Sequence, residues 1–300
     1  CLSSEGRIGG VGGIAADVWE SEISGCVSEA SIICQESVGG IGGIIGSANR
    51  SVLTDCQNSG SVTGAGTYTG GVAGLLNSGQ IEALAHVAGG IGGEILLNYE
   101  GEAEASDCRN SGEVSGLDGS CGGIFGSVLQ TADTEPEGQS IIRVNGCENS
   151  GRVLGGGWNT GGILGMVTLL AWDGDLFETA DCLNSGELLA QTEGAMVEFG
   201  GIIGGMVTSS GEKVIRDCSN GGKLTLQVAA ETKAQPVPCF GGGIVGSAAE
   251  DVAISGCKNS GVISVEGADE SWLVWDEMAA NIKQTVSMEE IRERVEARED

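Results

Sequence analysis

Thiol and imidazole groups are the first candidates for chemistry in this sequence of 300 residues, which contains 11 cysteines and a single histidine. Cysteine-protease chemistry needs a cysteine beside a histidine. His86 lies in an Ala-His-Val-Ala linker without any accompanying pattern, so we interpret it as structural. No Cys-x-x-Cys occurs, so the usual spacing of a zinc site is absent. The sequence predicts no catalytic, metal-binding or cofactor-binding residue, and therefore no enzyme.

Two short phrases look like active-site motifs but are better explained as parts of a repeat. Asp118-Gly-Ser120-Cys-Gly-Gly is similar to a serine-protease phrase, but its residues come in the wrong order. Gly241-x-Gly243-x-x-Gly246 fits the dinucleotide-binding fingerprint. That fingerprint needs a strand before it and a helix after it, and no long helix is indicated here. We assign neither phrase a chemical role.

Carboxylates are the remaining reactive groups. Asp55, Asp107, Asp181 and Asp217 each precede a repeated cysteine, and we expect them to point outward as part of a solvated acidic face. Calcium needs about six oxygen ligands, and the glycine- and aspartate-rich repeat that binds it in other solenoids is missing, so we predict no calcium site. Carboxylates are nonetheless plentiful, which leaves a glycosidase with two paired carboxylates as the enzymatic alternative.

Composition excludes several classes of protein. The 14 basic and 42 acidic residues give a formal charge of −28, which disfavours binding to nucleic acid or to anionic membranes. No apolar run reaches the roughly 18 residues of a membrane span, so direct membrane insertion is not expected. The chain has 55 glycines but only 3 prolines and is 40% hydrophobic, unlike collagen or an acidic disordered chain. A repeat protein fits these values.

Two phrases alternate along the chain and define that repeat. The first, Cys-x-Asn-Ser-Gly-x-(Val/Ile/Leu), begins at Cys56, Cys108, Cys147, Cys182 and Cys257, with variants that begin at Cys1, Cys26, Leu75 and Cys218. The second, Gly-Gly-Ile-x-Gly, recurs with small changes at Gly70, Gly122, Gly161, Gly200 and Gly242. The mean period is about 32 residues, which is typical of a solenoid.

Within the first phrase, Cys, Asn and Gly share one parity and the variable residues share the other, which is typical of a strand. We predict an all-β, right-handed parallel β-helix-like solenoid of about eight rungs over residues 1–267. Stacked rungs would place equivalent side chains in columns, in which asparagines hydrogen-bond from rung to rung. The predicted cysteine column is Cys1, Cys26, Cys56, Cys108, Cys147, Cys182, Cys218 and Cys257. The predicted asparagine column is Asn58, Asn77, Asn110, Asn149, Asn184, Asn220 and Asn259.

Buried thiols behave as small apolar side chains, so we expect the cysteine column to be unbridged. Cys34, Cys121 and Cys239 lie outside the column, and we expect no disulfide from them either. The segments between Gly-Gly-Ile-x-Gly and the next cysteine vary in length, and 206–215 is predicted to form a hairpin arm.

The tail, residues 268–300, departs from the repeat. Trp272, Trp275, Met278 and Ile282 fall at helical spacing, and Ser287 with Glu290 forms a capping box. We predict two short helices that cap the solenoid or link it to a next domain. Because Cys1 already matches the repeat phrase, we expect the sequence to begin inside a longer solenoid.

Both phrases resemble the GLUG repeat over residues 1 to about 267. This resemblance implies a β-helix-like solenoid of the kind found in bacterial surface and secreted proteins, including adhesin-like proteins and non-catalytic parts of secreted peptidases. It implies no catalytic residues and an extracellular or cell-envelope location. The expected function is a structural or adhesion segment that spaces the neighbouring domains of a longer chain or presents a binding face. Its partner would be a host or cell-surface ligand, either a glycan or a protein.

A carbohydrate-binding or carbohydrate-active β-helix is the alternative function. Sugars stack on exposed aromatic rings, so aromatic residues gathered on one face would favour it. The candidates are few, and they are Tyr68, Trp158, Trp172, Phe177 and Phe240.

Overall fold

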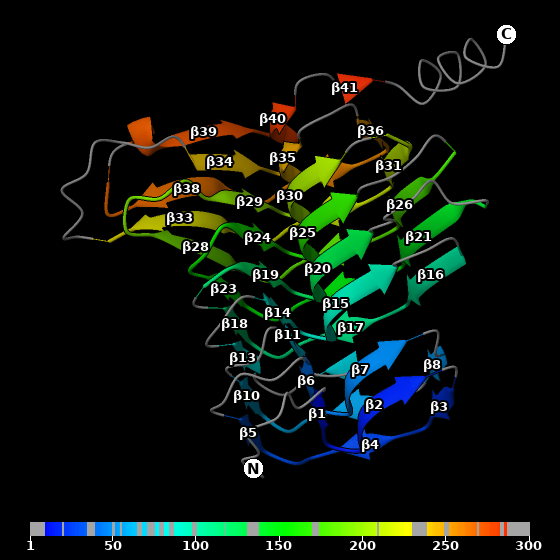
Figure 1. The fold of residues 1–300 in the computed structure, drawn as a ribbon. Helices are drawn as coiled ribbons and strands as arrows, with labels where there is room; N and C mark the ends of the chain where they lie inside the picture. The colour runs from blue at the N-terminus through cyan, green and yellow to red at the C-terminus, as the bar shows by residue number, and fades with distance from the viewer. Residues whose placement is uncertain are drawn as a thin grey trace, which may run out of the picture.

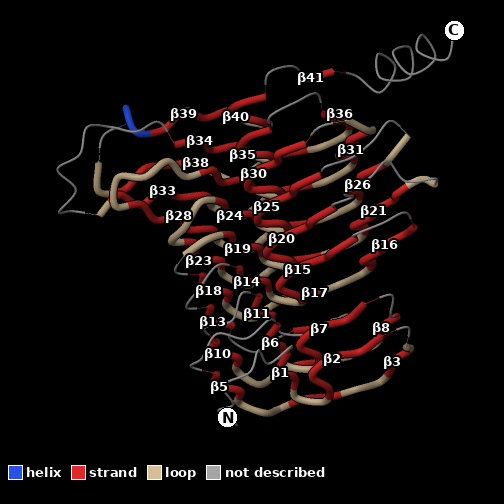
Figure 2. Tube along the Cα trace, in the orientation of Figure 1, coloured by secondary structure: helices blue, strands red, loops and turns tan. Residues whose placement is uncertain are grey.

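The computed structural model is all-β, and strands appear throughout it, with one short helix near the C-terminal end (Figure 2). It describes residues 10–19, 21–34, 40–49, 52–54, 56–64, 68–70, 76–77, 81–83, 87–97, 101–116, 118–130, 138–169, 174–208, 210–229, 239–248, 252–268, 270–282 and 285–286. Cys1, Asp55, His86 and Trp172 lie outside the described residues. No helix among the described residues is long and apolar enough to span a membrane.

The chain winds as a parallel β-solenoid, in which one complete coil contributes a strand to each of five sheets (Figure 1). The coil that starts at Ser120 returns to the same position at Asn159, its partner in the next coil. Since every described strand pair is parallel and in register, equivalent residues of the repeat phrases stack on one another.

Three sheets form the body of the solenoid. The glycine sheet contains β1 (Gly10–Gly12), β6 (Gly40–Gly42), β11 (Tyr68–Gly70), β14 (Val87–Gly89), β19 (Ser120–Gly122), β24 (Asn159–Gly161), β29 (Glu198–Gly200), β34 (Cys239–Gly242) and β39 (Leu273–Asp276). The asparagine sheet contains β4 (Val27–Ser28), β9 (Gln57–Asn58), β12 (Leu76–Asn77), β17 (Arg109–Asn110), β22 (Glu148–Asn149), β27 (Leu183–Asn184), β32 (Ser219–Asn220) and β37 (Lys258–Asn259). The apolar sheet contains β5 (Ile32–Cys34), β10 (Val62–Gly64), β13 (Ile81–Ala83), β18 (Val114–Gly116), β23 (Val153–Gly155), β28 (Leu188–Thr192), β33 (Leu224–Val228) and β38 (Ile263–Glu266).

Two further layers extend from the body, and we call them together the wing. The first wing sheet contains β15 (Gly92–Leu97), β20 (Phe125–Gln130), β25 (Leu164–Leu169), β30 (Ile203–Thr208), β35 (Val245–Ala248) and β40 (Ala279–Ile282), with β2 (Ala15–Trp19) and β7 (Ile45–Asn49) as a separate pair. The second wing sheet contains β16 (Gly101–Ser106), β21 (Ser140–Asn145), β26 (Leu176–Ala180), β31 (Glu212–Arg216), β36 (Val252–Ser255) and β41 (Thr285–Val286), with β3 (Glu22–Ser24) and β8 (Val52–Thr54) as a separate pair.

The prediction of a hairpin arm at residues 206–215 is wrong, because this segment forms strands of the two wing sheets. β30 and β31 do not pair with each other but lie in different sheets, where each pairs in parallel with the equivalent strand of the next coil. Alternating side chains of both layers, among them Val128, Ile142 and Phe177, are buried in one shared cluster. This segment of variable length is therefore a wall of the coil.

The Gly-Gly-Ile-x-Gly phrase forms the sharp corner between the glycine sheet and the first wing sheet. A Cβ atom on Gly162 would lie 2.0 Å from the carbonyl oxygen of Gly201 in the next coil and 2.5 Å from the Asn184 side chain. Only glycine permits this close approach of backbones. The isoleucine of the phrase, such as Ile163, is fully buried in the corner.

The prediction of a helix through Trp272, Trp275, Met278 and Ile282 is wrong. A single 3-10 turn, η1 (Glu270–Trp272), precedes β39 and β40, which extend the glycine sheet and the first wing sheet. Their pairing with β34 and β35 supplies backbone hydrogen bonds that override the helical spacing. Trp272 is buried against the interior of the body. The second predicted helix, residues 287–295, lies outside the described residues.

Candidate functional site

The repeated asparagine of the first phrase forms an asparagine row inside the solenoid. The amide nitrogen of Asn110 donates to the Asn149 oxygen at 2.9 Å, and the next three steps, through Asn184 and Asn220 to Asn259, measure 2.9, 2.8 and 2.9 Å. Each amide also donates to the glycine carbonyl two residues later, at 3.0 Å for Asn149. Asn110, Asn149, Asn184 and Asn220 are at most 1% exposed. The side chain of Asn77 lies outside the described residues.

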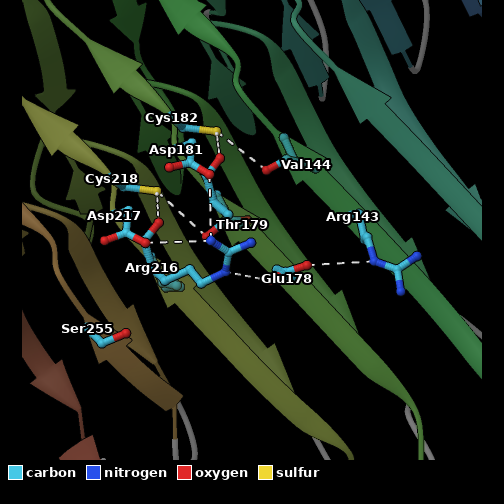
Figure 3. A network of polar contacts seen from close by, with 12 residues as sticks. Arg143, Val144, Glu178, Thr179, Asp181, Cys182, Arg216, Asp217, Cys218 and Ser255 are labelled. Carbon is cyan, nitrogen blue, oxygen red and sulfur yellow. Dashed lines mark hydrogen bonds and ion pairs between the residues drawn. The ribbon is translucent and has the colours of Figure 1, made fainter. Parts of the chain in front are cut away.

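A row of thiols runs beside the asparagines. Cys182 donates to the carbonyl of Ala180 at 3.3 Å and to that of Val144, in the preceding coil, at 3.4 Å (Figure 3). Hydrogen bonds to its neighbours Cys147 and Cys218, together with burial, raise the pKa of the Cys182 thiol. These contacts bring Cys108, Cys147, Cys182, Cys218 and Cys257 into one row, and Cys26 and Cys56 stack in the same way at the other end.

The three cysteines outside the row are also buried. Cys34 lies in β5, and Cys121 and Cys239 lie in the glycine sheet. Burial raises the pKa of the Cys121 thiol to about 12. At pH 8 only about one Cys121 in ten thousand would then be the reactive thiolate.

We expect thiol titration without reductant to count ten or eleven thiols in denatured protein, because all ten described cysteines are present as thiols. In the folded protein at pH 8, few should react within minutes, because burial hinders access and suppresses the thiolate of Cys121. A count of two or fewer in denatured protein would mean that the cysteines are paired in disulfides.

Three aspartates stand in the column directly before the thiol row. Asp107, Asp181 and Asp217 all have a φ of 54°, in the left-handed region that Asp tolerates better than most residues. Glycines Gly146 and Gly256 occupy the same column with φ of 62° and 64°. The restriction of this position to Asp or Gly in the described coils is thus imposed by the backbone, a signal that the sequence contains but that we interpreted only as an acidic face.

An ion-pair row runs over the outer face of the second wing sheet (Figure 3). Arg143 contacts Glu102 at 3.0 Å and Glu178 at 3.6 Å, and Arg216 contacts Glu178 at 2.8 Å. Arg216 also reaches Asp181 and Asp217, at 3.6 and 3.5 Å. The hydrogen bond to Glu178 is the main reason that the pKa of Arg216 is raised. Carboxylate and guanidinium therefore alternate from coil to coil.

We expect millimolar calcium to change the melting temperature by no more than about 2 °C. Of the three aspartates in the column before the thiol row, Asp181 and Asp217 both pair with Arg216. No group of three His, Cys, Asp or Glu side chains in the described part of the chain could hold a metal ion. Six oxygen ligands are thus not gathered. Differential scanning fluorimetry with calcium and with a chelator measures this, and a rise of many degrees with calcium would contradict it.

A groove of about 420 Å³ lies over the outer face of the asparagine sheet. Its lining includes the ion pair of Arg109 and Glu148, whose atoms are 3.1 Å apart, and the exposed apolar side chains of Val27 and Leu183. Serines from four coils complete it: Ser59, Ser111, Ser150 and Ser185. A volume in this range suits a small ligand or a loop of a partner.

Glu198 differs from the exposed acidic residues in its surroundings. Burial raises the pKa of Glu198, which lies at the outer corner between the glycine sheet and the first wing sheet. It accepts a hydrogen bond from Asn159 at 2.8 Å and is also bonded to Ser247. Neither neighbour is a carboxylic acid, so these contacts do not form the carboxylate pair of a glycosidase.

The aromatic candidates that the structure describes do not all lie on one exposed face. Phe177 is 1% exposed in the core of the wing, so its proposed role in sugar stacking is wrong. Trp158 is 72% exposed, directly before β24, and Phe240 is half-buried in β34. Nothing is described of the side chain of Tyr68. Trp158 is thus the clearest exposed ring on this part of the surface.

No family model and no curated protein matches the chain. One solved structure that the chain resembles is a crystal structure from Bacteroides ovatus described as a "putative immunoglobulin A1 protease". The two share 20% sequence identity with a TM-score of 0.47, over 89% of this chain and 82% of the other. A likeness this distant carries no argument about activity.

Proposed function

We propose that the chain is a non-catalytic structural or adhesion segment of a secreted or cell-surface bacterial protein. In this role it spaces neighbouring domains or presents a binding face to a host or cell-surface glycan or protein. The finer architecture we propose is a right-handed solenoid of about eight rungs. The observation that carries the proposal is the use of the repeated Asn and Cys side chains as continuous internal rows.

The surface supports the same function. The groove over the asparagine sheet offers serine hydroxyls, two exposed apolar side chains and an ion pair, which together suit a polar ligand better than a purely apolar one. Elsewhere on the surface, the charges of Arg152 with Glu113 and Glu187, and of Lys223 with Glu266, alternate from coil to coil. Such ordered exterior rows keep the surface regular, as a spacer requires.

Single-molecule pulling from the two ends tests the spacer function. A spacer should resist force and then yield in steps, because each coil packs only on its neighbours. Adjacent coils are offset by 35 residues between Glu148 and Leu183 and by 39 between Arg109 and Glu148. Steps of roughly 120–140 Å of contour length are therefore expected. Smooth extension at low force would contradict the proposal.

The second candidate is a carbohydrate-binding or carbohydrate-active β-helix, favoured by the half-buried Glu198 beside the exposed Trp158, whose carbonyl accepts the Glu198 N–H at 2.8 Å. Incubation with plant and mucin polysaccharides distinguishes the two. We expect no release of reducing ends. Release that disappears in a Glu198→Gln variant would favour the enzyme.

A further inference from the structure

The wing is interrupted where the body is continuous. The three body sheets run unbroken through β11, β12 and β13, but the described residues at this level add no strand to the wing. Among the described strands, β7 and β8 pair with β2 and β3 alone, and β15 and β16 start new six-stranded sheets. Figure 1 shows the blue β7 and β8 set apart from the cyan β15 and β16, while the strands of the body continue past them.

Chain length requires this interruption. In a complete coil, 25 residues separate Gly122 from Glu148 and include the six-residue strands β20 and β21. Only five residues, 71–75, separate β11 from β12. Five residues cannot supply strands of this length to both wing layers, whatever their path. At most one of the two wing layers can therefore continue through this coil.

Among the described residues, the hydrophobic interior is divided at the same level. Ile44, Ile45 and Cys56 form one cluster, separate from the wing cluster that begins at Ile91. Ile95, Leu97 and Ala103 are only partly buried, whereas their counterparts one coil later, including Val128 and Ile142, are fully buried. Apolar side chains that would pack against the missing layer are thus accessible at this edge.

Backbone groups of β16 also face the interruption. The N–H groups of Gly101 and Asp107 donate to carbonyls of Gln139 and Asn145 in the next coil, at 3.1 and 3.0 Å. Successive residues of a strand direct their backbone groups to opposite sides, so those of Glu102, Glu104 and Ser106 are directed to the open side. An added strand could hydrogen-bond to them, as in β-augmentation.

The ion-pair row indicates the charge that a strand added beside β16 should carry. From Arg216 in β31 back toward the interruption, the row runs Arg216, Glu178, Arg143 and then Glu102, so cation and carboxylate alternate. β16 presents the exposed Glu102 and Glu104 at its open edge. The next position in the alternation is a cation. The inward positions of the added strand would lie opposite Ala103 and Ala105 and should carry apolar side chains.

We propose that the open edge of β16 binds an extended segment of a partner polypeptide, which adds as a strand with Lys or Arg facing Glu102 and Glu104 and apolar side chains facing Ala103 and Ala105. The edge of β16 to which no described strand pairs, the accessible interior and the carboxylate end of the ion-pair row all fit the same occupant. This docking edge is separate from the groove over the asparagine sheet, so its test stands apart from that of the proposed function.

A blocked peptide of about eight residues that alternates lysine and valine is the probe. Fluorescence anisotropy should show saturable binding that weakens with salt. A peptide with the same composition, but with its lysines and valines in two blocks, should not bind. Residue-resolved hydrogen exchange should show slower exchange of the Glu102 and Glu104 amides in the complex, because they become hydrogen-bonded donors.

A matched pair of variants tests the charges. Glu102→Gln with Glu104→Gln should weaken the peptide about tenfold or more. Glu187→Gln with Glu266→Gln removes two exposed, ion-paired carboxylates elsewhere and should change affinity less than about twofold. Circular dichroism checks that both variants fold. Absence of binding, equal binding of the block peptide, or protection elsewhere would overturn the proposal. So would protection of the same amides without peptide in a concentration-dependent dimer, because a second copy would then be the occupant.

Discussion

Replacing Gly162 by alanine is expected to lower the free energy of unfolding by about 3–5 kcal/mol. The new methyl group would lie 2.0 Å from the Gly201 carbonyl oxygen and 2.5 Å from the Cγ atom of Asn184. Neither can move away cheaply, because Gly201 is the equivalent corner of the next coil and Asn184 is held in the asparagine row. Chemical denaturation followed by far-ultraviolet circular dichroism measures the change.

Gly221 provides the matched control for this substitution. It stands where the other copies of the phrase have serine, and a Cβ atom there meets nothing closer than the Ser260 hydroxyl at 3.7 Å. Gly221→Ser should therefore be neutral or stabilise by up to about 1 kcal/mol, since it restricts the unfolded chain. Equal destabilisation by both substitutions would contradict the corner geometry.

Asn149→Ala is expected to lower the free energy of unfolding by about 2–4 kcal/mol. The substitution removes a hydrogen bond from Asn110, one to Asn184 and one to the Gly151 carbonyl, at 2.9, 2.9 and 3.0 Å. It leaves those partners buried without a replacement, and an unsatisfied buried polar group costs more than the hydrogen bond itself gains. The same denaturation experiment measures it.

Asn259→Ala tests whether position in the row matters. Asn259 is the last described asparagine of the row and is only half-buried, so water can replace part of what it loses. We expect about 1 kcal/mol. If the substitution at Asn259 were as damaging as that at Asn149, burial would not be the cause.

The body of the solenoid was predictable from the sequence because its strands carry identical phrases at fixed spacing. Parallel pairing in register stacks identical residues, so a cysteine or asparagine that recurs in the sequence recurs along a column in the structure. Asn110, Asn149 and Asn184 illustrate this, since their spacing in the phrase is enough to place them one above another.

The wing was not predictable because its strands share no phrase. β20, β25 and β30 pair in register, yet Ser127, Met166 and Gly205 occupy one position in them. The register of the wing strands is set by the corners on either side of them. A local sequence pattern within the strands does not contain that information. The ion pairs of Arg143 and Arg216 depend on that register. Phe177 is buried because the two layers of the wing pack against each other.

The helix predicted in the tail was wrong for a different reason. The spacing of Trp272, Trp275 and Met278 fits a helix. However, β34 and β35 of the preceding coil present backbone groups to which another strand can hydrogen-bond. Tertiary pairing outweighed local preference, as it often does for short segments.

A double-mutant cycle on the asparagine row tests the central claim, that the repeated polar residues form a continuous internal row. Asn149→Ala and Asn184→Ala remove neighbours joined at 2.9 Å, so their effects on unfolding free energy should couple by about 1–2 kcal/mol. Asn110 and Asn220 are separated by two intervening asparagines, and their substitutions should add within about 0.5 kcal/mol. Additive effects for the neighbouring pair would contradict the row.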